Sequence, residues 1–149
     1  MSVTICAHSS RQPRRGRSIT ITWYSTDRKL ATVARGGASK AEALQIIDGY
    51  FARLKPHYES GEEALAETMF GFQKSPEEYV ELCINSPTEI SCRYQTVEPR
   101  KILFLNLPKI IRSERTLTSK EAAKNEVSLF YDLEAVAFRS HAGAWLSSS

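Results

Sequence analysis

The chain has 149 residues, of which 42% are hydrophobic and 25% are charged, and its formal charge is +3. This length fits one domain, and the composition excludes a wholly disordered chain. No apolar run approaches the roughly 18 residues that a membrane span needs. A signal peptide is not expected, because the basic stretch follows the first apolar residues instead of preceding them. We therefore expect one soluble, cytoplasmic domain.

The N-terminal region carries strand patterns. Val3 and Ile5 indicate a short strand, and a basic loop over residues 9–17 follows it. Residues 18–25 alternate between apolar and polar side chains, which is typical of a half-buried strand. The apolar face of this segment consists of Ile19, Ile21 and Trp23. Residues 29–34 are expected to return as a second strand.

Helical patterns come next. Gly36-Gly37 is expected to break the sheet, and Ser39 with Glu42 forms a capping box that starts a helix. The apolar stripe of this helix consists of Leu44, Ile47, Phe51 and Leu54. Pro56 is expected to end it, because proline lacks the amide that a helix requires. A second short helix is predicted over residues 62–70.

Residues 79–97 predict a β-hairpin. Apolar side chains alternate on both sides of a turn at residues 85–88. If these side chains share one face, the register is fixed, because a slip of one residue would reverse every side chain. The expected pairs are Val80 with Tyr94, Leu82 with Cys92, and Ile84 with Ile90. This register requires a loop of three or five residues. Alternatively, residues 75–78 begin a short helical turn before the first strand.

The C-terminal region predicts a strand and a helix. Residues 101–107 are nearly all apolar, which favours a central strand buried on both faces. Thr118–Glu121 is a capping-box pattern that starts a helix to about Asp132. Residues 136–138 are expected to be a last strand or extended segment, and residues 147–149 a frayed tail.

This order of elements predicts an α+β fold. Two to three helices would pack on one face of a mostly antiparallel sheet. Neither an internal repeat nor a low-complexity linker interrupts the chain, so residues 1–149 are expected to form a single domain.

The charges are strongly segregated along the chain. Residues 1–53 hold nine bases and three acids, residues 56–91 hold one base and eight acids, and residues 92–149 hold nine bases and six acids. The small net charge therefore conceals an acidic central segment. Such local fields matter more to a binding partner than the net charge does.

The cysteines and histidines do not predict a catalytic or metal site. Cys6, Cys83 and Cys92 are odd in number and lack a CxxC spacing, so reduced thiols are expected. Cys6 and His8 would share a strand face as a nucleophile and base, but nothing in the sequence orients the imidazole or supplies an oxyanion hole. We predict no catalytic residue, no metal site and no cofactor.

Two basic or glycine-rich features have ordinary interpretations. The 9–17 loop holds a compact set of bases that nucleic-acid phosphates would attract. Its members are Arg11, Arg14, Arg15 and Arg17. No aromatic side chains are interleaved with them, so a solvated loop is the simpler interpretation. Gly36-Gly37 before a helix lacks the phosphate-binding patterns and is expected to be a flexible connection.

The acidic segment is the predicted binding surface for a protein partner. Carboxylates placed on one surface would attract a basic partner and fix its register. Tyr79 would serve as an aromatic anchor, because aromatic residues are enriched in interface hot spots. The proposed contacts are Glu59, Glu62, Glu63, Glu67, Glu77, Glu78, Tyr79 and Glu81. Glu63 and Glu67 are four residues apart, but no histidine lies at ligand spacing, so we do not predict a metal site there.

Two segments carry a family resemblance. EYVELCINSPTEISCRYQTV at residues 78–97 and RTLTSKEAAKNEVSLFYD at residues 115–132 resemble, in order and spacing, the small immunity proteins of bacterial polymorphic-toxin systems. The resemblance covers residues 39–140. It implies a cytoplasmic α+β protein that binds a cognate toxin and blocks its active site.

The sequence therefore predicts a non-enzymatic protein that neutralises a protein toxin by steric and electrostatic occlusion. We expect no membrane partner. Two alternatives remain open: a nucleic-acid-binding module that uses the loop Arg11–Arg17, and a secretion-type chaperone.

Overall fold

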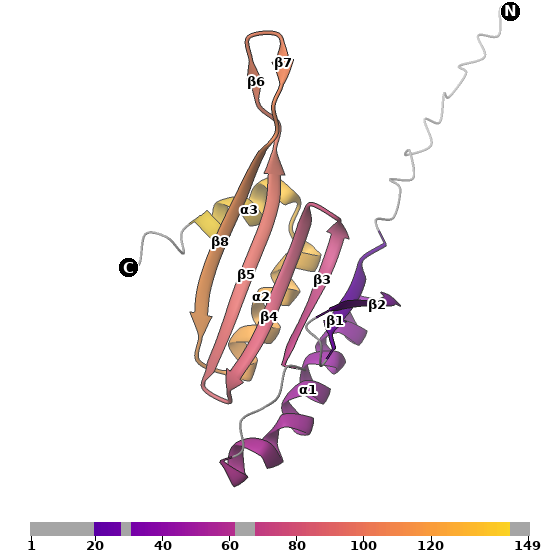
Figure 1. Ribbon diagram of the computed structural model, residues 1–149, viewed down its shortest axis with the longest axis vertical. Coiled ribbons are helices and arrows are strands. Elements are labelled where there is room, and N and C mark those ends of the chain that lie inside the picture. The colour runs from indigo at the N-terminus through magenta and orange to yellow at the C-terminus, as the bar shows by residue number, and fades with distance from the viewer. Residues whose placement is uncertain (1–19, 28–30, 62–67, 144–149) are drawn as a thin grey trace, which may run out of the picture.

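The computed structural model describes residues 20–27, 31–61 and 68–143 of the chain (Figure 1). Its elements in chain order are β1 (Thr22–Thr26), β2 (Thr32–Gly37), α1 (Lys40–Ser60), β3 (Met69–Ser75), β4 (Glu78–Ser86), β5 (Glu89–Glu98), β6 (Lys101–Ile102), β7 (Leu105–Asn106), β8 (Lys109–Leu117), α2 (Lys120–Asp132) and α3 (Ala135–Gly143).

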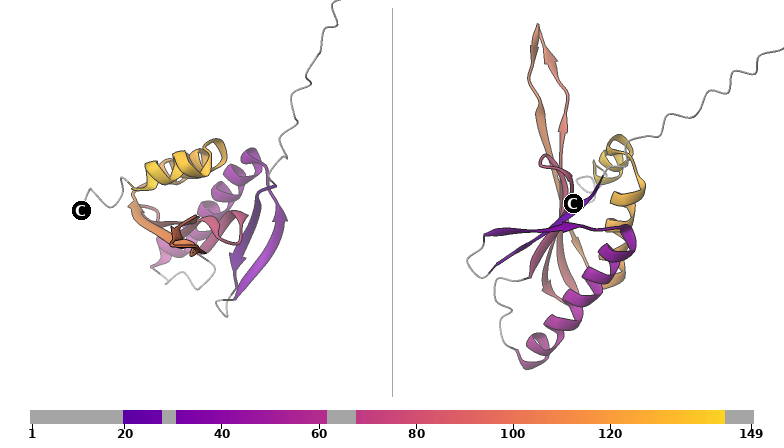
Figure 2. Two further views of the ribbon diagram at one scale, coloured as in Figure 1. Left: turned by 90° about the horizontal axis from the view of Figure 1, so that it is seen from above. Right: turned by 90° about the vertical axis from the view of Figure 1, so that its right-hand side faces the viewer.

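Within these ranges, six antiparallel strands form one sheet in the order β2-β1-β3-β4-β5-β8. Helices α1, α2 and α3 lie on the same side of this sheet (Figure 2). The short strands β6 and β7 form a separate two-stranded arm that projects from β5 and β8 (Figure 1). The expected α+β class, with helices packed on a mostly antiparallel sheet, is confirmed.

The hydrophobic core lies between the sheet and the helices. Alternate residues of β4 and β5 point toward the helices, and α1 and α2 contribute apolar stripes at helical spacing. Its fully buried members include Phe70, Phe72, Val80, Leu82, Ile84, Ile90, Cys92, Tyr94, Ala43, Ile47, Ala123, Val127, Phe130 and Phe138. Each large apolar side chain buried there stabilises the fold by about 1.5–3 kcal/mol.

The hairpin β4–β5 has the predicted register. Val80 pairs with Tyr94, Leu82 with Cys92, and Ile84 with Ile90. Five residues separate Ile84 from Ile90, and the register shifts between Ile84 and Ser86. Cys92 is buried in the core while the neighbouring strand's Cys83 is only partly buried, and neither forms a disulfide. The alternative helical turn before β4 is wrong, because Ser75 pairs with Glu78 across a tight turn between β3 and β4.

Helix α1 begins as predicted but ends later. The Ser39 hydroxyl accepts a hydrogen bond from the Glu42 amide, and the Glu42 carboxylate accepts one from the Ser39 amide, so the capping box is present. The prediction that Pro56 ends the helix is wrong. Proline has no amide hydrogen, so Pro56 cannot donate to the carbonyl of Ala52. Ala52 lies on the exposed face of the helix, where water can bond to this carbonyl. The helix instead ends at Ser60, and its C-cap Gly61 is left-handed with φ 71°.

The predicted helix α2 is confirmed, with Ser119 rather than Thr118 as its N-cap. The Ser119 hydroxyl accepts a hydrogen bond from the Ala122 amide at 3.1 Å. The predicted last strand at residues 136–138 is wrong, because this segment belongs to α3. Phe138 and Ala142 are four residues apart and both are buried, so a helical face docks on the core.

Two expectations in the first half of the chain are also corrected. The predicted helix over residues 62–70 is wrong at its C-terminal end, because Met69 and Phe70 belong to β3; residues 62–67 lie outside the described ranges. Gly36-Gly37 does not break the sheet, because these residues pair with Trp23 and Thr22 at the end of β2. Gly36 has φ 112°, which accommodates the register shift next to it.

The largest correction concerns residues 101–107. They are not a buried central strand; they are exposed along their whole length and form the arm β6–β7. The sheet edge is instead Lys109–Leu117, which pairs with β5 along its full length. An apolar run marks a buried strand only when other elements cover it, and here the chain extends beyond the end of the sheet.

The predicted strand at Val3 and Ile5, the basic loop over residues 9–17 and the tail at residues 147–149 lie outside the described residues.

Candidate functional site

The face of the sheet opposite the helices carries two rows of polar side chains. The first row runs from Tyr79 on β4 through Gln95 on β5 to Arg112 on β8, because these residues are cross-strand partners. The Tyr79 hydroxyl donates to the Gln95 carbonyl oxygen Oε1 at 3.1 Å, and the Arg112 Nε donates to the same atom at 3.0 Å. The amide of Gln95 therefore holds the phenol and the guanidinium in place.

The second row runs across five strands. Tyr24 on β1 pairs with Gly71 on β3, which pairs with Glu81 on β4, and Arg93 and Glu114 continue the row on β5 and β8. The Arg93 guanidinium lies 3.9 Å from the Glu81 carboxylate and 3.4 Å from that of Glu114.

Gly71 is the reason that Tyr24 can enter this row. A Cβ atom at position 71 would overlap the phenol oxygen and ring of Tyr24. Without it, the ring of Tyr24 lies over the glycine, and its hydroxyl donates to Glu81 Oε2 at 3.0 Å. The rings of Tyr24 and Tyr79 meet edge to face with centroids 6.5 Å apart. This places two tyrosines side by side on the open face.

We call this set the open-face cluster; it consists of Tyr24, Tyr79, Glu81, Arg93, Gln95, Arg112 and Glu114. A concavity of about 490 Å³ lies among its side chains on β4, β5 and β8. Burial, followed by the Glu81 carboxylate, raises the pKa of both Tyr24 and Tyr79. Both phenols therefore stay protonated near neutral pH and keep their hydrogen bonds to Glu81 and Gln95. The guanidinium groups of Arg93 and Arg112 and the carboxylates of Glu81 and Glu114 provide donors and acceptors for a ligand.

The predicted acidic contacts do not converge in the described residues. Glu81 belongs to the open-face cluster, but Glu78 is drawn inward, 3.8 Å from Lys74. The Lys74 ammonium also donates to the Leu133 carbonyl at 2.9 Å, so this carboxylate has a structural role. Glu77 is exposed in the turn between β3 and β4.

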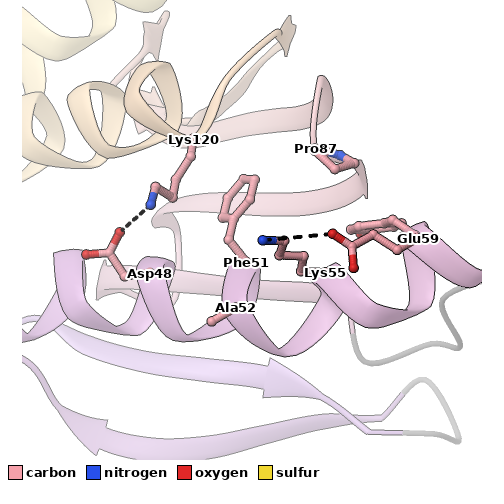
Figure 3. Close-up of a pocket in the computed structure, with 8 residues that line it drawn as sticks. Asp48, Phe51, Ala52, Lys55, Glu59, Pro87 and Lys120 are labelled. Carbon is pink, nitrogen blue, oxygen red and sulfur yellow. Dashed lines mark ion pairs between the residues drawn. The ribbon is translucent and has the colours of Figure 1, made fainter.

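Glu59 lies at the opposite end of β4, near the turn between β4 and β5. It lines a largely apolar groove of about 590 Å³ between α1, that turn and the start of α2 (Figure 3). The groove is lined by Asp48, Phe51, Ala52, Lys55, Tyr58, Glu59, Pro87 and Lys120. Its charges are paired with one another, Lys55 with Glu59 at 3.8 Å and Lys120 with Asp48 at 3.3 Å. A direct hydrogen bond from Lys124 is the largest cause of the lowered pKa of Asp48.

Sequence reasoning also missed a buried carboxylate on the helix-covered face. Glu126 of α2 is almost fully buried and accepts a hydrogen bond from Arg115 at 3.1 Å. His141 of α3 lies 2.8 Å from its other oxygen. These contacts join β8, α2 and α3. The nearby Cys92 thiol has a raised pKa because it is buried, and therefore remains protonated.

Several predicted residues lie outside the described ranges. They are the basic-loop residues Arg11, Arg14, Arg15 and Arg17, the acidic residues Glu62, Glu63 and Glu67, and the pair Cys6 and His8. Across the described residues, no three His, Cys, Asp or Glu side chains gather as a metal site would require. No helix in the described ranges has the length and hydropathy needed to cross a membrane.

Comparison with protein-family models, curated proteins and solved structures finds no significant match to this chain.

Proposed function

We propose that this chain is a non-enzymatic binding protein that recognises a protein partner through the open-face cluster. The observation that supports it is a concavity lined by Tyr79, Arg93 and Arg112, on the face of the sheet that no described helix covers. Tyr24 adjoins this concavity through its edge-to-face contact with Tyr79. Tyrosine and arginine are enriched at protein interfaces and dominate their hot spots. Of the predicted contacts, Tyr79 and Glu81 belong to this surface, so the proposed interface keeps the predicted aromatic anchor.

The cluster is pre-organised for binding. Gln95 fixes Tyr79 and Arg112, and Glu81 fixes Tyr24, all from regular strands whose backbones pair with their neighbours. A partner would therefore order few side chains on docking, which lowers the entropic cost of binding. Five strands at a spacing of about 4.8 Å make the surface roughly 20 Å wide, which suits a compact protein–protein contact.

The resemblance of residues 78–97 and 115–132 to immunity proteins supports a more specific proposal. The chain would act in the cytoplasm as an inhibitor that covers the active site of a cognate toxin. In this proposal Glu81 and Glu114 meet basic groups of the partner, and Arg93 and Arg112 meet acidic ones. The balanced charges of the cluster would then select the partner's register.

Affinity capture from the native host, followed by a binding assay with the purified partner, tests this function. Tyr79→Ala and Arg112→Ala are each expected to weaken binding by roughly thirtyfold, the typical effect of a hot-spot truncation. Lys55→Ala, an exposed change on α1, is the matched control and should leave the affinity unchanged. If the partner is a toxin, the wild-type chain should abolish its activity at a stoichiometric ratio.

The competing acidic surface is tested in the same assay. Charge reversal of Glu62, Glu63 and Glu67 would weaken binding if that segment made the contact. Unchanged affinity for Tyr79→Ala and Arg112→Ala would exclude the open-face cluster as the interface.

A further inference from the structure

The arm β6–β7 projects from the end of β5 and β8, away from the helices (Figures 1 and 2). It is a tight hairpin in which Lys101 pairs with Asn106 and Ile102 with Leu105. The Leu107 amide donates to the Arg100 carbonyl at 2.8 Å and closes its base. The arm is therefore an ordered hairpin that holds its tip clear of the domain.

The tip exposes large apolar side chains that no element of the described residues covers. Leu103 is 89% exposed and Phe104 is fully exposed, and Ile102, Leu105 and Leu107 behind them are also exposed. Soluble proteins expose single apolar side chains routinely, but a contiguous exposed group usually marks a binding surface. The contiguous apolar side chains of the tip therefore indicate a binding surface.

The turn chemistry supports the same conclusion. Two-residue hairpin turns favour asparagine and glycine, because these residues tolerate a positive φ. Here Leu103 has φ 57°, a conformation in which its Cβ costs about 1–2 kcal/mol. A leucine and a phenylalanine at this turn therefore destabilise the hairpin, and they also place two large apolar side chains in water. Transfer of these two side chains into an apolar environment would offset that cost.

Cations surround the base of the apolar tip. Arg100 and Lys101 precede it and Lys109 follows it, all three exposed, whereas residues 102–107 carry no charge. Glu98, opposite Lys109 in the sheet, is the one acid in residues 98–109. The arm thus presents apolar side chains at its end and positive charge behind them.

We propose that the arm inserts its tip into the surface of an anionic lipid membrane. The order of groups along the arm matches the order of layers in a bilayer, with acyl chains deepest and anionic headgroups above them. The tip lies two to three residues beyond Lys101, about 7–10 Å at roughly 3.3 Å per residue. This is the depth at which interfacial elements bury their apolar side chains. The proposal departs from the expectation, based on the sequence, of no membrane partner.

Charge complementarity favours a lipid surface over a protein pocket as the occupant. Arg100 and Lys101 precede the tip and Lys109 follows it, so an anionic surface that receives the tip would meet positive charge from both chain segments at the base of the arm. The proposal is independent of the open-face cluster, which lies on the sheet itself and remains available to a protein.

Co-sedimentation of the full-length chain with vesicles tests the proposal. The wild-type chain is expected to bind vesicles of phosphatidylcholine and phosphatidylglycerol, and to bind phosphatidylcholine vesicles far less. Phe104→Ser should lower the partition coefficient roughly tenfold or more, because one large apolar side chain no longer enters the bilayer. Lys101→Ser should lower it roughly fivefold on the anionic vesicles only. High salt should remove the preference of the wild-type chain for the anionic vesicles.

Two matched variants control for non-specific effects. Val136→Ser removes an exposed apolar side chain from α3, and Lys55→Ser removes an exposed charge from α1; both should bind as the wild type does. In Phe104→Trp, brominated lipid should quench the fluorescence added by the new indole, as expected for insertion.

Absence of vesicle binding, or binding that Phe104→Ser does not change, would overturn the proposal. If Phe104→Ser abolishes capture of a protein partner while vesicle binding is absent, the arm is a protein contact and the membrane proposal is wrong.

Discussion

Substitution of Gly71 by alanine tests how the open-face cluster is built. The Tyr24 ring occupies the space that a side chain at position 71 would need, and its hydroxyl reaches Glu81 only across that glycine. Tyr24 is itself buried and cannot simply rotate into solvent. Gly71→Ala should therefore displace the ring and break its hydrogen bond to the carboxylate.

The expected magnitude follows from three terms. Overpacking by one methyl group costs about 1–3 kcal/mol, and loss of a hydrogen bond to a carboxylate costs about 1.5–3 kcal/mol. Alanine in a strand recovers about 0.5–1 kcal/mol relative to glycine. We expect Gly71→Ala to lower the free energy of unfolding by about 3 kcal/mol.

A double-mutant cycle with urea unfolding is the assay. In a Tyr24→Ala background the space above position 71 is empty, so Gly71→Ala should become neutral or stabilise the fold by about 0.5–1 kcal/mol. Partner affinity should fall for Gly71→Ala, because the adjacent Tyr24 and Glu81 no longer hold their positions. If Gly71→Ala costs the same with and without Tyr24, the proposed packing of this ring is refuted.

Three further predictions concern stability. Glu126→Gln should lower the free energy of unfolding by about 1–3 kcal/mol in urea titrations, because its partners Arg115 and His141 both reach water and lose only part of their interaction. Ser119→Ala should cost about 1 kcal/mol through loss of the α2 N-cap, seen as a lower Tm. The pKa of Tyr24 is raised in the folded state, so its contribution to stability is present below pH 10 and is lost as pH rises beyond it. Unfolding free energies measured across this alkaline range should fall, and Tyr24→Phe should reduce the slope.

Local patterns predicted the middle of the fold well. The alternation on both sides of the turn at residues 85–88 was sufficient to set the register of β4 and β5, because only one register places all apolar side chains on the covered face. The same is true of Ser39, whose hydroxyl caps α1. The pattern at Thr118–Glu121 predicted the start of α2 to within one residue of its cap, Ser119. In each case the determinants lie within a few residues of one another.

Elements whose environment depends on distant parts of the chain were predicted less well. The apolar run at residues 101–107 has the composition of a buried strand, and only the way β5 and β8 pair shows that it extends past the sheet. Val136 and Phe138 suggested a strand, whereas the four-residue spacing of Phe138 and Ala142 was the available signal for a helix. Gly61 was likewise the available signal for the end of α1.

The open-face cluster was predicted only in part, for the same reason. Tyr79 and Glu81 came from the acidic segment of the sequence. Arg112 and Glu114 could not be assigned to the same surface, because β8 was not predicted as a strand. Tyr24 joins them through the pairing of β1 with β3, which connects segments on either side of α1.

That strand order has a consequence for how the chain assembles. The neighbours β3, β4 and β5 follow one another along the chain through short turns, so their contacts close small loops and form quickly. β1 and β2 pair with each other locally, but they join the sheet only through β3, after all of α1. During synthesis this N-terminal hairpin leaves the ribosome before its docking strand has been made. Trp23 of β1 and the adjacent Ile21 pack into the core only once β3 is present, so this hairpin is open to aggregation and to chaperones while the protein is being translated.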